Sequence, residues 1–133
     1  MKKLALKAYK VSNIELKNRV QGAVKLQLKN QYSHNVKYGK DNNCEGVFTV
    51  KITDGNGNEN FGITATVQGI FTWEGELDRE QAHKETFAAL FPYARALVST
   101  LTANAGMMPI MIPPVDIENQ DIYRIEMNPP KGE

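Results

Sequence analysis

Apolar residues recur at every second position up to about residue 73, and at every third or fourth position from about residue 79 onward. A period of two predicts β-strands with one buried face, and a period of three to four predicts an amphipathic helix. The alternating runs all come first. The sequence therefore predicts an α+β domain, a four-stranded antiparallel sheet followed by helices packed on one face.

Four alternating runs predict the strands of this sheet, each with one apolar and one polar face. The pair Ser12-Asn13 predicts a bend in the first strand, and Gly69 predicts a bulge or bend that swings the end of the fourth strand out of plane. The strands are expected at residues 3–18, 24–29, 48–53 and 61–73, with a turn-rich connection at 38–43 and a hairpin turn at 54–58.

Two helical pieces are predicted after the strands, within residues 79–105. Asp78 can cap the amides of the first helix, with Gln81 placed as in a capping box. Pro92 lacks an amide hydrogen and suits a first helical position, so the first piece should end near residue 90 and a second should begin at Pro92. Gly106 supplies a left-handed residue just past the end. The apolar face of the second helix comprises Ala94, Leu97, Val98, Leu101 and Ala105.

The segment 107–114 contains three methionines, two isoleucines and three prolines. It cannot continue a helix and is too apolar for an ordinary loop, so we expect something to cover it. Beyond it, Asp116 could cap a short helix in a C-terminal element at 115–127, and a strand or irregular tail fits the spacing of the isoleucines there equally well. At 133 residues the whole chain, 1–133, is expected to be a single domain.

Composition favours a cytoplasmic protein. No apolar run approaches the roughly 20 residues that cross a bilayer. The start Met1-Lys2-Lys3 resembles a signal peptide, but Lys7, Lys10 and Glu15 interrupt the apolar stretch that such a peptide needs. The lone Cys44 cannot form an internal disulfide, which agrees with a reducing compartment.

Charge is divided unevenly along the chain. Residues 1–40 carry ten Lys or Arg against Glu15 alone, a net charge of +9; since the whole chain carries +1, residues 41–133 carry −8. Lys7, Lys25 and Lys29 could form a basic sheet face that binds nucleic acid or an acidic partner. No nucleic-acid recognition motif accompanies the charge, and alternating lysines also mark an ordinary solvated face.

The sequence predicts no enzyme, catalytic residue, metal site or cofactor. Asp54, Asn56 and Asn58 imitate the start of a calcium loop, but Glu59 and Ala65 stand where Gly and a bidentate Glu are required. Other polar residues offer no better case: His34 and His83 lie in unrelated segments, with His83 expected to be solvated, and Glu74 and Glu76 fit a solvated turn. A phosphate-binding Gly-rich loop with Lys is also missing, which disfavours an ATP-driven mechanism.

Two motifs carry a resemblance to a known family. Leu90-Phe91-Pro92-Tyr93-Ala94-Arg95 follows Gly69-Ile70-Phe71 at about 20 residues, and Gly106, Pro109 and the Pro114-Val115 pair come after them in order. Together with Val24-Lys25-Leu26, these residues resemble the bacterial protein-export chaperones of the SecB family, over most of the chain.

The resemblance implies a homotetramer, a dimer of dimers with helices sandwiched between two sheet layers, that binds unfolded polypeptides or preproteins without nucleotide and delivers them to SecA for export. The strand Ile63–Val67 lacks the acidic side chains that family members present to SecA. A chaperone dedicated to a toxin–antitoxin system is the alternative, and a non-enzymatic oligomer that binds nucleic acid through the basic sheet face is another.

The resemblance also suggests which residues act. A client groove that accepts many sequences favours aromatic side chains and deformable thioethers. The expected client-binding residues are Phe71, Trp73, Met107, Met108, Met111 and Ile112. The helix is apolar over a wider arc than one sheet would cover, so its remaining face is expected to meet another subunit. The expected interface residues are Tyr93, Ala94, Leu97, Val98 and Leu101.

Overall fold

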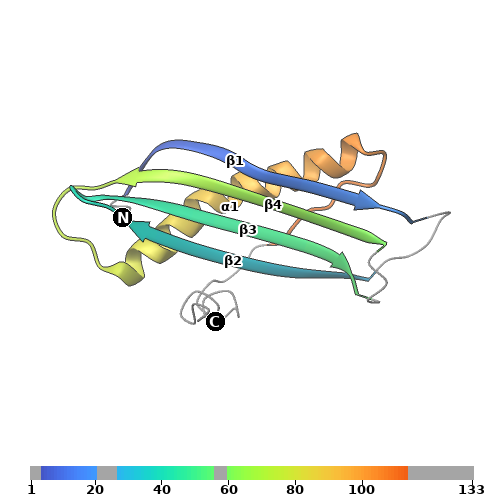
Figure 1. Ribbon diagram of the computed structural model, residues 1–133, viewed down its shortest axis with the longest axis horizontal. Helices are drawn as coiled ribbons and strands as arrows, with labels where there is room; N and C mark the ends of the chain where they lie inside the picture. Colours follow the sequence, from blue (N-terminus) through green and yellow to red (C-terminus); the bar gives the residue numbers. More distant parts are fainter. Residues whose placement is uncertain (1–3, 21–26, 56–59, 114–133) are drawn as a thin grey trace.

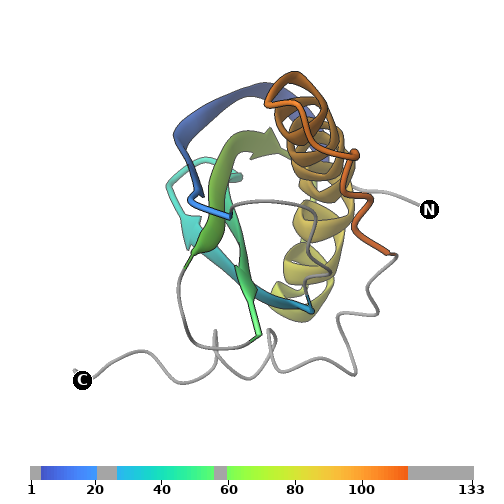
Figure 2. The ribbon, with the colours of Figure 1, turned by 90° about the vertical axis from the view of Figure 1, so that its right-hand side faces the viewer.

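A computed structural model describes residues 4–20, 27–55 and 60–113. Its strands form one antiparallel sheet in the order β1-β4-β3-β2, and one helix crosses a single face of this sheet diagonally (Figure 1). Seen along the strands, sheet and helix make two layers (Figure 2). The predicted α+β class is confirmed. The elements are β1 (Ala5–Asn18), β2 (Leu28–Tyr38), β3 (Asn43–Asp54), β4 (Phe61–Thr72) and α1 (Arg79–Asn104).

The second strand lies later in the chain than the sequence pattern predicted. β2 begins at Leu28 and continues to Tyr38, whereas 24–29 was expected, and residues 24–26 lie outside the described residues. The predicted turn at 38–43 is confirmed, because Asp41 and Asn42 adopt left-handed φ angles of 63° and 57° and the Gly39 amide donates to the Asn43 carbonyl. β3 and β4 pair as the predicted hairpin, whose residues 56–59 are not among those described.

β1 contains two bulges, at the register shifts between Leu6 and Ala8 and between Val11 and Asn13. The second lies at the bend predicted at Ser12-Asn13. The first was not predicted, and it reverses which side chains face the helix. Since cross-strand partners share a face, Ala8 lies with exposed Ile70 on the outer side of the sheet, while Tyr9 lies opposite Gly69 on the helix side.

Gly69 does not cause the bend that was predicted in β4. The pairing of β4 with β3 runs without a shift through Gly69, which lies directly opposite Gly46. Both glycines leave room for Leu90 of α1: a Cβ at Gly69 would lie 2.9 Å from Leu90 Cδ2, and one at Gly46 would lie 3.2 Å from Leu90 Cδ1. The two glycines therefore form a seat that lets the helix approach the centre of the sheet closely.

A single helix replaces the two predicted pieces, because Pro92 lies inside α1 and does not begin a new helix. The Pro92 side chain is exposed. An amide at position 92 would donate to the Ala88 carbonyl, and Ala88 is exposed as well. That carbonyl lies on the solvent side of the helix, where water can replace the lost donor. The fully buried stripe of α1 repeats mainly every fourth residue and comprises Ala82, Thr86, Phe87, Leu90, Ala94, Val98 and Thr102. Ala105, predicted on that face, is exposed.

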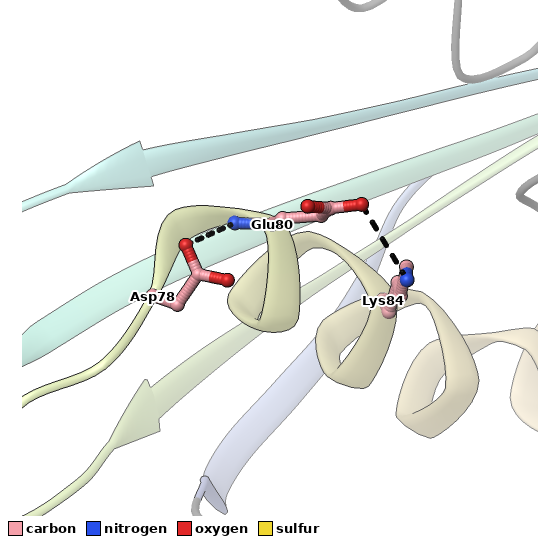
Figure 3. Close-up of polar contacts among 3 residues, drawn as sticks. All are labelled: Asp78, Glu80 and Lys84. Carbon is pink, nitrogen blue, oxygen red and sulfur yellow. Dashed lines mark hydrogen bonds and ion pairs between the residues drawn. The ribbon is translucent and has the colours of Figure 1, made fainter.

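Both ends of α1 are capped by residues that the sequence identified. Asp78 accepts a hydrogen bond from the Glu80 amide, and Glu80 forms an ion pair with Lys84 one turn later (Figure 3). The Gln81 side chain donates a hydrogen bond to Glu85 and forms no capping box with Asp78 among the described residues. At the other end Gly106 has a φ of 84°. The Gly106 and Met107 amides donate to carbonyls of the last helical turn, which makes a Schellman motif.

Candidate polypeptide-binding surface

The helix side of β1 carries large apolar side chains that α1 does not cover. Tyr9, Val11 and Ile14 face this side but are 48%, 41% and 44% exposed. The corresponding side chains of β3 and β4, such as Phe48 and Val67, are fully buried. β1 is also an edge strand, so one side of its backbone lacks a neighbouring strand within the described sheet. Together these features make β1 a surface that another polypeptide can cover.

Tyr9 and Tyr93 connect this edge to the helix. Their rings stack with centroids 4.1 Å apart and an angle of 26° between the ring planes, although Tyr93 is itself 40% exposed. Tyr93 was predicted as an interface residue and Tyr9 was not singled out. Stacked tyrosines offer a rigid apolar platform with polar hydroxyls, a combination common where proteins bind each other.

The segment after α1, residues 107–113, is held in place by Ile110 and Ile112, and we call it the methionine segment. The Ile110 amide donates to Thr102 Oγ1 at 2.9 Å, and Ile112 is fully buried in the core. Met111, between them, is 60% exposed with its sulphur 3.4 Å from Ser99 Oγ, and Met108, which precedes Ile110, is 86% exposed. The segment is thus held against the last turns of α1 while presenting two flexible thioethers to solvent.

The predicted client-binding residues do not form one continuous groove in the described structure. Phe71 and Ile112 are buried in the core. Trp73 follows β4, which ends at one end of the sheet, whereas Met108 and Met111 follow α1, which ends at the opposite end (Figure 1). Of the predicted client-binding residues, only the methionines are near one another at the surface: Met108 and Met111 are exposed and Met107 is half-buried.

The predicted interface residues also divide by exposure. Ala94 and Val98 belong to the buried stripe that α1 packs against the sheet. Leu97 and Leu101 are half-buried and pack against the edge of the core, while Tyr93 is the most exposed of the five. Tyr93 is thus the one of the five whose side chain is exposed beside the uncovered β1 side chains, where it stacks on Tyr9.

Two histidines that looked unrelated in the sequence are neighbours. The rings of His34 on β2 and His83 on α1 lie 4.9 Å apart, edge to face, and His34 Nε2 lies 2.8 Å from Thr86 Oγ1. His34 is fully buried against Phe48 and Phe87, and His83 is half-buried, not solvated as predicted. Burial, with a smaller contribution from His83, lowers the pKa of His34 to about 3, and burial also lowers the pKa of His83.

Cys44, another side chain that could be reactive, is part of the core. Cys44 is buried, and burial raises the pKa of its thiol to about 11, so the thiol stays protonated and unreactive at neutral pH. Within the described ranges no three His, Cys, Asp or Glu side chains gather as a metal site requires. No helix in that part of the chain has both the length and the apolar character needed to cross a membrane.

The fold and this surface define a small α+β protein that leaves part of its apolar surface uncovered. A family model described as preprotein translocase subunit SecB matches residues 1–128. The chain belongs to the SecB family.

Two curated relatives are longer than the parts matched, and one of them is named SecB. An uncharacterized protein, MJ0357, of Methanocaldococcus jannaschii is 32% identical over 101 residues, which cover 70% of this chain and 64% of that protein. The protein-export protein SecB of Rhodospirillum centenum is 37% identical over 68 residues, 48% of this chain and 39% of that protein. The matched parts thus span less than two thirds of either relative.

Solved structures share the fold at low sequence identity. The SecB-like chaperone Rv1957 of Mycobacterium tuberculosis, in complex with a ChAD peptide from the Rv1956 HigA1 antitoxin, matches with a TM-score of 0.66 and 17% identity, over 86% of this chain and 88% of that one. A protein of unknown function from Streptococcus agalactiae matches with a TM-score of 0.50 and 10% identity, over 83% and 96% of the two chains.

Proposed function

We propose that this protein is an ATP-independent chaperone, a holdase that binds unfolded polypeptides through apolar surface at β1 and at the methionine segment. Membership of the SecB family supports a chaperone role. The observation that carries the proposal is the uncovered apolar surface itself, since Met108, Met111, Tyr9, Val11 and Ile14 are all at least 41% exposed.

This surface suits clients of many sequences. Methionine side chains are unbranched and polarizable, so they repack around different apolar groups at little cost. An edge strand adds backbone hydrogen bonds that do not depend on the side chains of the client. Trp73, half-buried after β4, extends the apolar surface at the other end of the sheet. No step of this binding needs nucleotide, metal or catalysis.

A homotetramer is part of the proposal. A second copy could cover Tyr9, Val11, Ile14 and Tyr93, which are too large and too exposed for a stable free surface. The half-buried Leu97 and Leu101 would complete such an interface. In the assembled protein the methionine segment would remain free for clients, and β1 would bind a client only in a copy whose edge no second copy covers.

We propose export clients in the cytoplasm as the first case, because the family description and one curated relative both refer to protein export. Docking on SecA is the less supported part, since the outer side of β4 carries threonines where acidic residues were expected. The M. tuberculosis structure, bound to an antitoxin peptide, supports the alternative of a client from a toxin–antitoxin system.

The test is suppression of aggregation of a chemically unfolded protein without ATP, with the mass of the chaperone fixed by light scattering. We expect a tetramer that suppresses aggregation at about one tetramer per client. Met108→Ser with Met111→Ser should weaken suppression several-fold, and Trp73→Ala should weaken it less. Ile70→Ser is the matched control, because Ile70 is 42% exposed but lies on the outer side of the sheet. Equal suppression by the double methionine variant and the wild type would count against the proposal.

A further inference from the structure

The side of the sheet opposite α1 contains a groove that the proposed function does not use. It has a volume of about 610 Å³ and lies where β1 ends and β2 begins. Residues from all four strands line it, and we call it the outer groove. Its polar lining includes Glu15 and Lys17 of β1, Lys29 of β2, Lys51 and Asp54 of β3 and Thr64 of β4.

Strand register brings three lysines to this groove. Lys17 pairs with Gly62, Gly62 with Thr53 and Thr53 with Lys29, so these four residues form one row across the sheet. Lys51 belongs to the next row, between Gln31 and Thr64. None of the three lysines forms an ion pair with any residue of the described chain. Their charges are therefore available to an anionic partner.

Gly62 has no side chain, so the groove is deep at this residue. A Cβ built at this position would meet only the Ile52 carbonyl oxygen, at 3.9 Å, so the space above it is open. Lys17 and Lys29 stand on either side, separated by three strand spacings, roughly 14 Å between their Cα atoms. An extended chain covers that distance in about four residues, so carboxylates spaced four residues apart could reach both lysines.

The carboxylate of Glu15 favours a polypeptide over a nucleic acid. Glu15 would repel a continuous phosphate backbone, whereas a peptide can place its separate carboxylates away from it. Asp54 does not add to this preference, because its side chain is buried and alternation along β3 places it on the helix side with Ile52, away from Lys51.

We propose that the outer groove binds an acidic, extended segment of a partner polypeptide, held by Lys17, Lys29 and Lys51 across the floor formed by Gly62. This groove is separate from the exposed apolar side chains of β1, which lie on the helix side, and from the methionine segment, which follows α1. It selects partners by charge, whereas the apolar surface does not select by sequence. Acidic segments beside apolar ones in the same partner would engage both surfaces and gain affinity through their linkage.

The test is fluorescence anisotropy of a labelled Glu-Ser repeat peptide with the full-length protein, against a Gln-Ser repeat of equal length. We expect binding of the acidic peptide alone, weakened by added salt. The triple variant Lys17→Gln, Lys29→Gln and Lys51→Gln should bind about tenfold more weakly. Gly62→Val, which fills the floor without changing charge, should also weaken binding. The matched control Lys7→Gln, Lys10→Gln and Lys37→Gln removes the same charge outside the groove and should stay within about twofold of the wild type.

Equal losses in the two triple variants would overturn the proposal, because net charge alone would then explain binding. Displacement of the peptide by a thymidine oligonucleotide at lower concentration would overturn it in favour of a nucleic-acid site. Thermal melting checks that each variant folds, and Gly62→Val repeats the test without a change of charge. Aggregation suppression should be unchanged in the groove variants, so failure here is distinguishable from failure of the holdase proposal.

Discussion

β1 and β2 are the two edges of one sheet, yet α1 covers them unequally. On β2 the inward side chain of His34 is fully buried against Phe87 and bonded to Thr86. On β1 the inward side chains of Val11 and Ile14 remain more than 40% exposed. Both side-chain sets face the helix, so the face that a residue occupies does not decide whether anything covers it.

The difference follows from the path of the helix. α1 begins close to β2, where Tyr38 contacts Arg79, and crosses the sheet diagonally (Figure 1). Leu90 packs against Gly46 and Gly69 at the centre of the sheet, and this contact sets the distance between the helix and the sheet. One helix cannot cover four strands completely, and β1 is the strand on which most of the exposed helix-side apolar side chains lie, with Leu28 of β2 a further one. We propose that this uncovered edge is a surface for partners.

The largest effect is expected where helix and sheet are closest. Leu90→Ala should lower the free energy of unfolding by about 2–5 kcal/mol, because the glycine seat cannot collapse around the smaller side chain. Leu97→Ala, at a half-buried position on the same helix, should cost less. Urea denaturation of both variants measures the difference. Equal losses would mean that the seat at Gly46 and Gly69 does not determine helix packing.

Burial of His34 on β2, the covered edge, should make the stability of the protein depend on pH, and β1 carries no such histidine. The folded state keeps His34 neutral down to about pH 3, while the unfolded chain binds a proton below about 6.5. The unfolded state therefore binds more protons between these values, and stability falls as pH falls through this window, by at most about 1.4 kcal/mol per pH unit. Above pH 6.5 this contribution is constant.

His34→Phe tests this expectation, since a phenyl ring fits among Phe48 and Phe87 and Thr86 still donates to the Ala82 carbonyl. Urea denaturation from pH 7 to pH 4 should show a shallower loss of stability in the variant than in the wild type. His83 and the carboxylates are common to both proteins, so the difference isolates His34. Parallel pH profiles would contradict the assigned pKa.

The start of α1 beside β2 should contribute a smaller amount. Asp78→Ala removes the cap on the Glu80 amide and should cost about 1 kcal/mol. Lys84→Ala removes the exposed ion pair with Glu80 and should cost less than about 0.5 kcal/mol. Thermal denaturation of the two variants ranks these effects. A larger loss for Lys84→Ala would show that Lys84 has a structural role beyond this pair.

The smallest effect on folding of one chain is expected at the uncovered edge. Val11→Thr with Ile14→Thr keeps branched side chains suited to a strand, and both positions are already exposed, so unfolding at low protein concentration should change by less than about 1 kcal/mol. Light scattering should instead report a lower mass at assay concentration. An unchanged mass would mean that another surface holds the assembly together.

Much of this architecture could be predicted because local chemistry determined it. The alternating runs of β3 and β4, the Asp78 cap and the left-handed Gly106 all act through nearby residues. β4, the cap and Gly106 are where the sequence placed them, and β3 begins earlier than expected, at Asn43. β2 was misplaced because its inward residues include His34, and its outward ones are lysine, amide and serine side chains. The series Tyr32, His34, Val36 and Tyr38 becomes visible as a strand only when histidine is accepted as a core residue.

The remaining differences depend on tertiary context. Pro92 signals a helix start, but it can lie within a helix when its ring and the orphaned carbonyl both face solvent. The bulge near Lys7 moves Tyr9 and Val11 to the helix side, so a strict period of two assigned Ala8 to the core in their place. No local signal marks the bulge at Lys7, unlike the one at Ser12-Asn13, which is why the apolar edge was missed.

The two bulges of β1 also limit how far this edge can propagate pairing. A regular strand laid along β1 can keep its register only within Ala8–Val11 or Asn13–Asn18, the stretches without a shift. Longer pairing requires a matching irregularity in the added chain. Under the proposed function, β1 would accept a short segment of a client or the same strand of a second copy, and an indefinite stack of strands would lose register at the first interruption. The irregularity that conceals this edge from sequence analysis would thus also limit fibril formation through it.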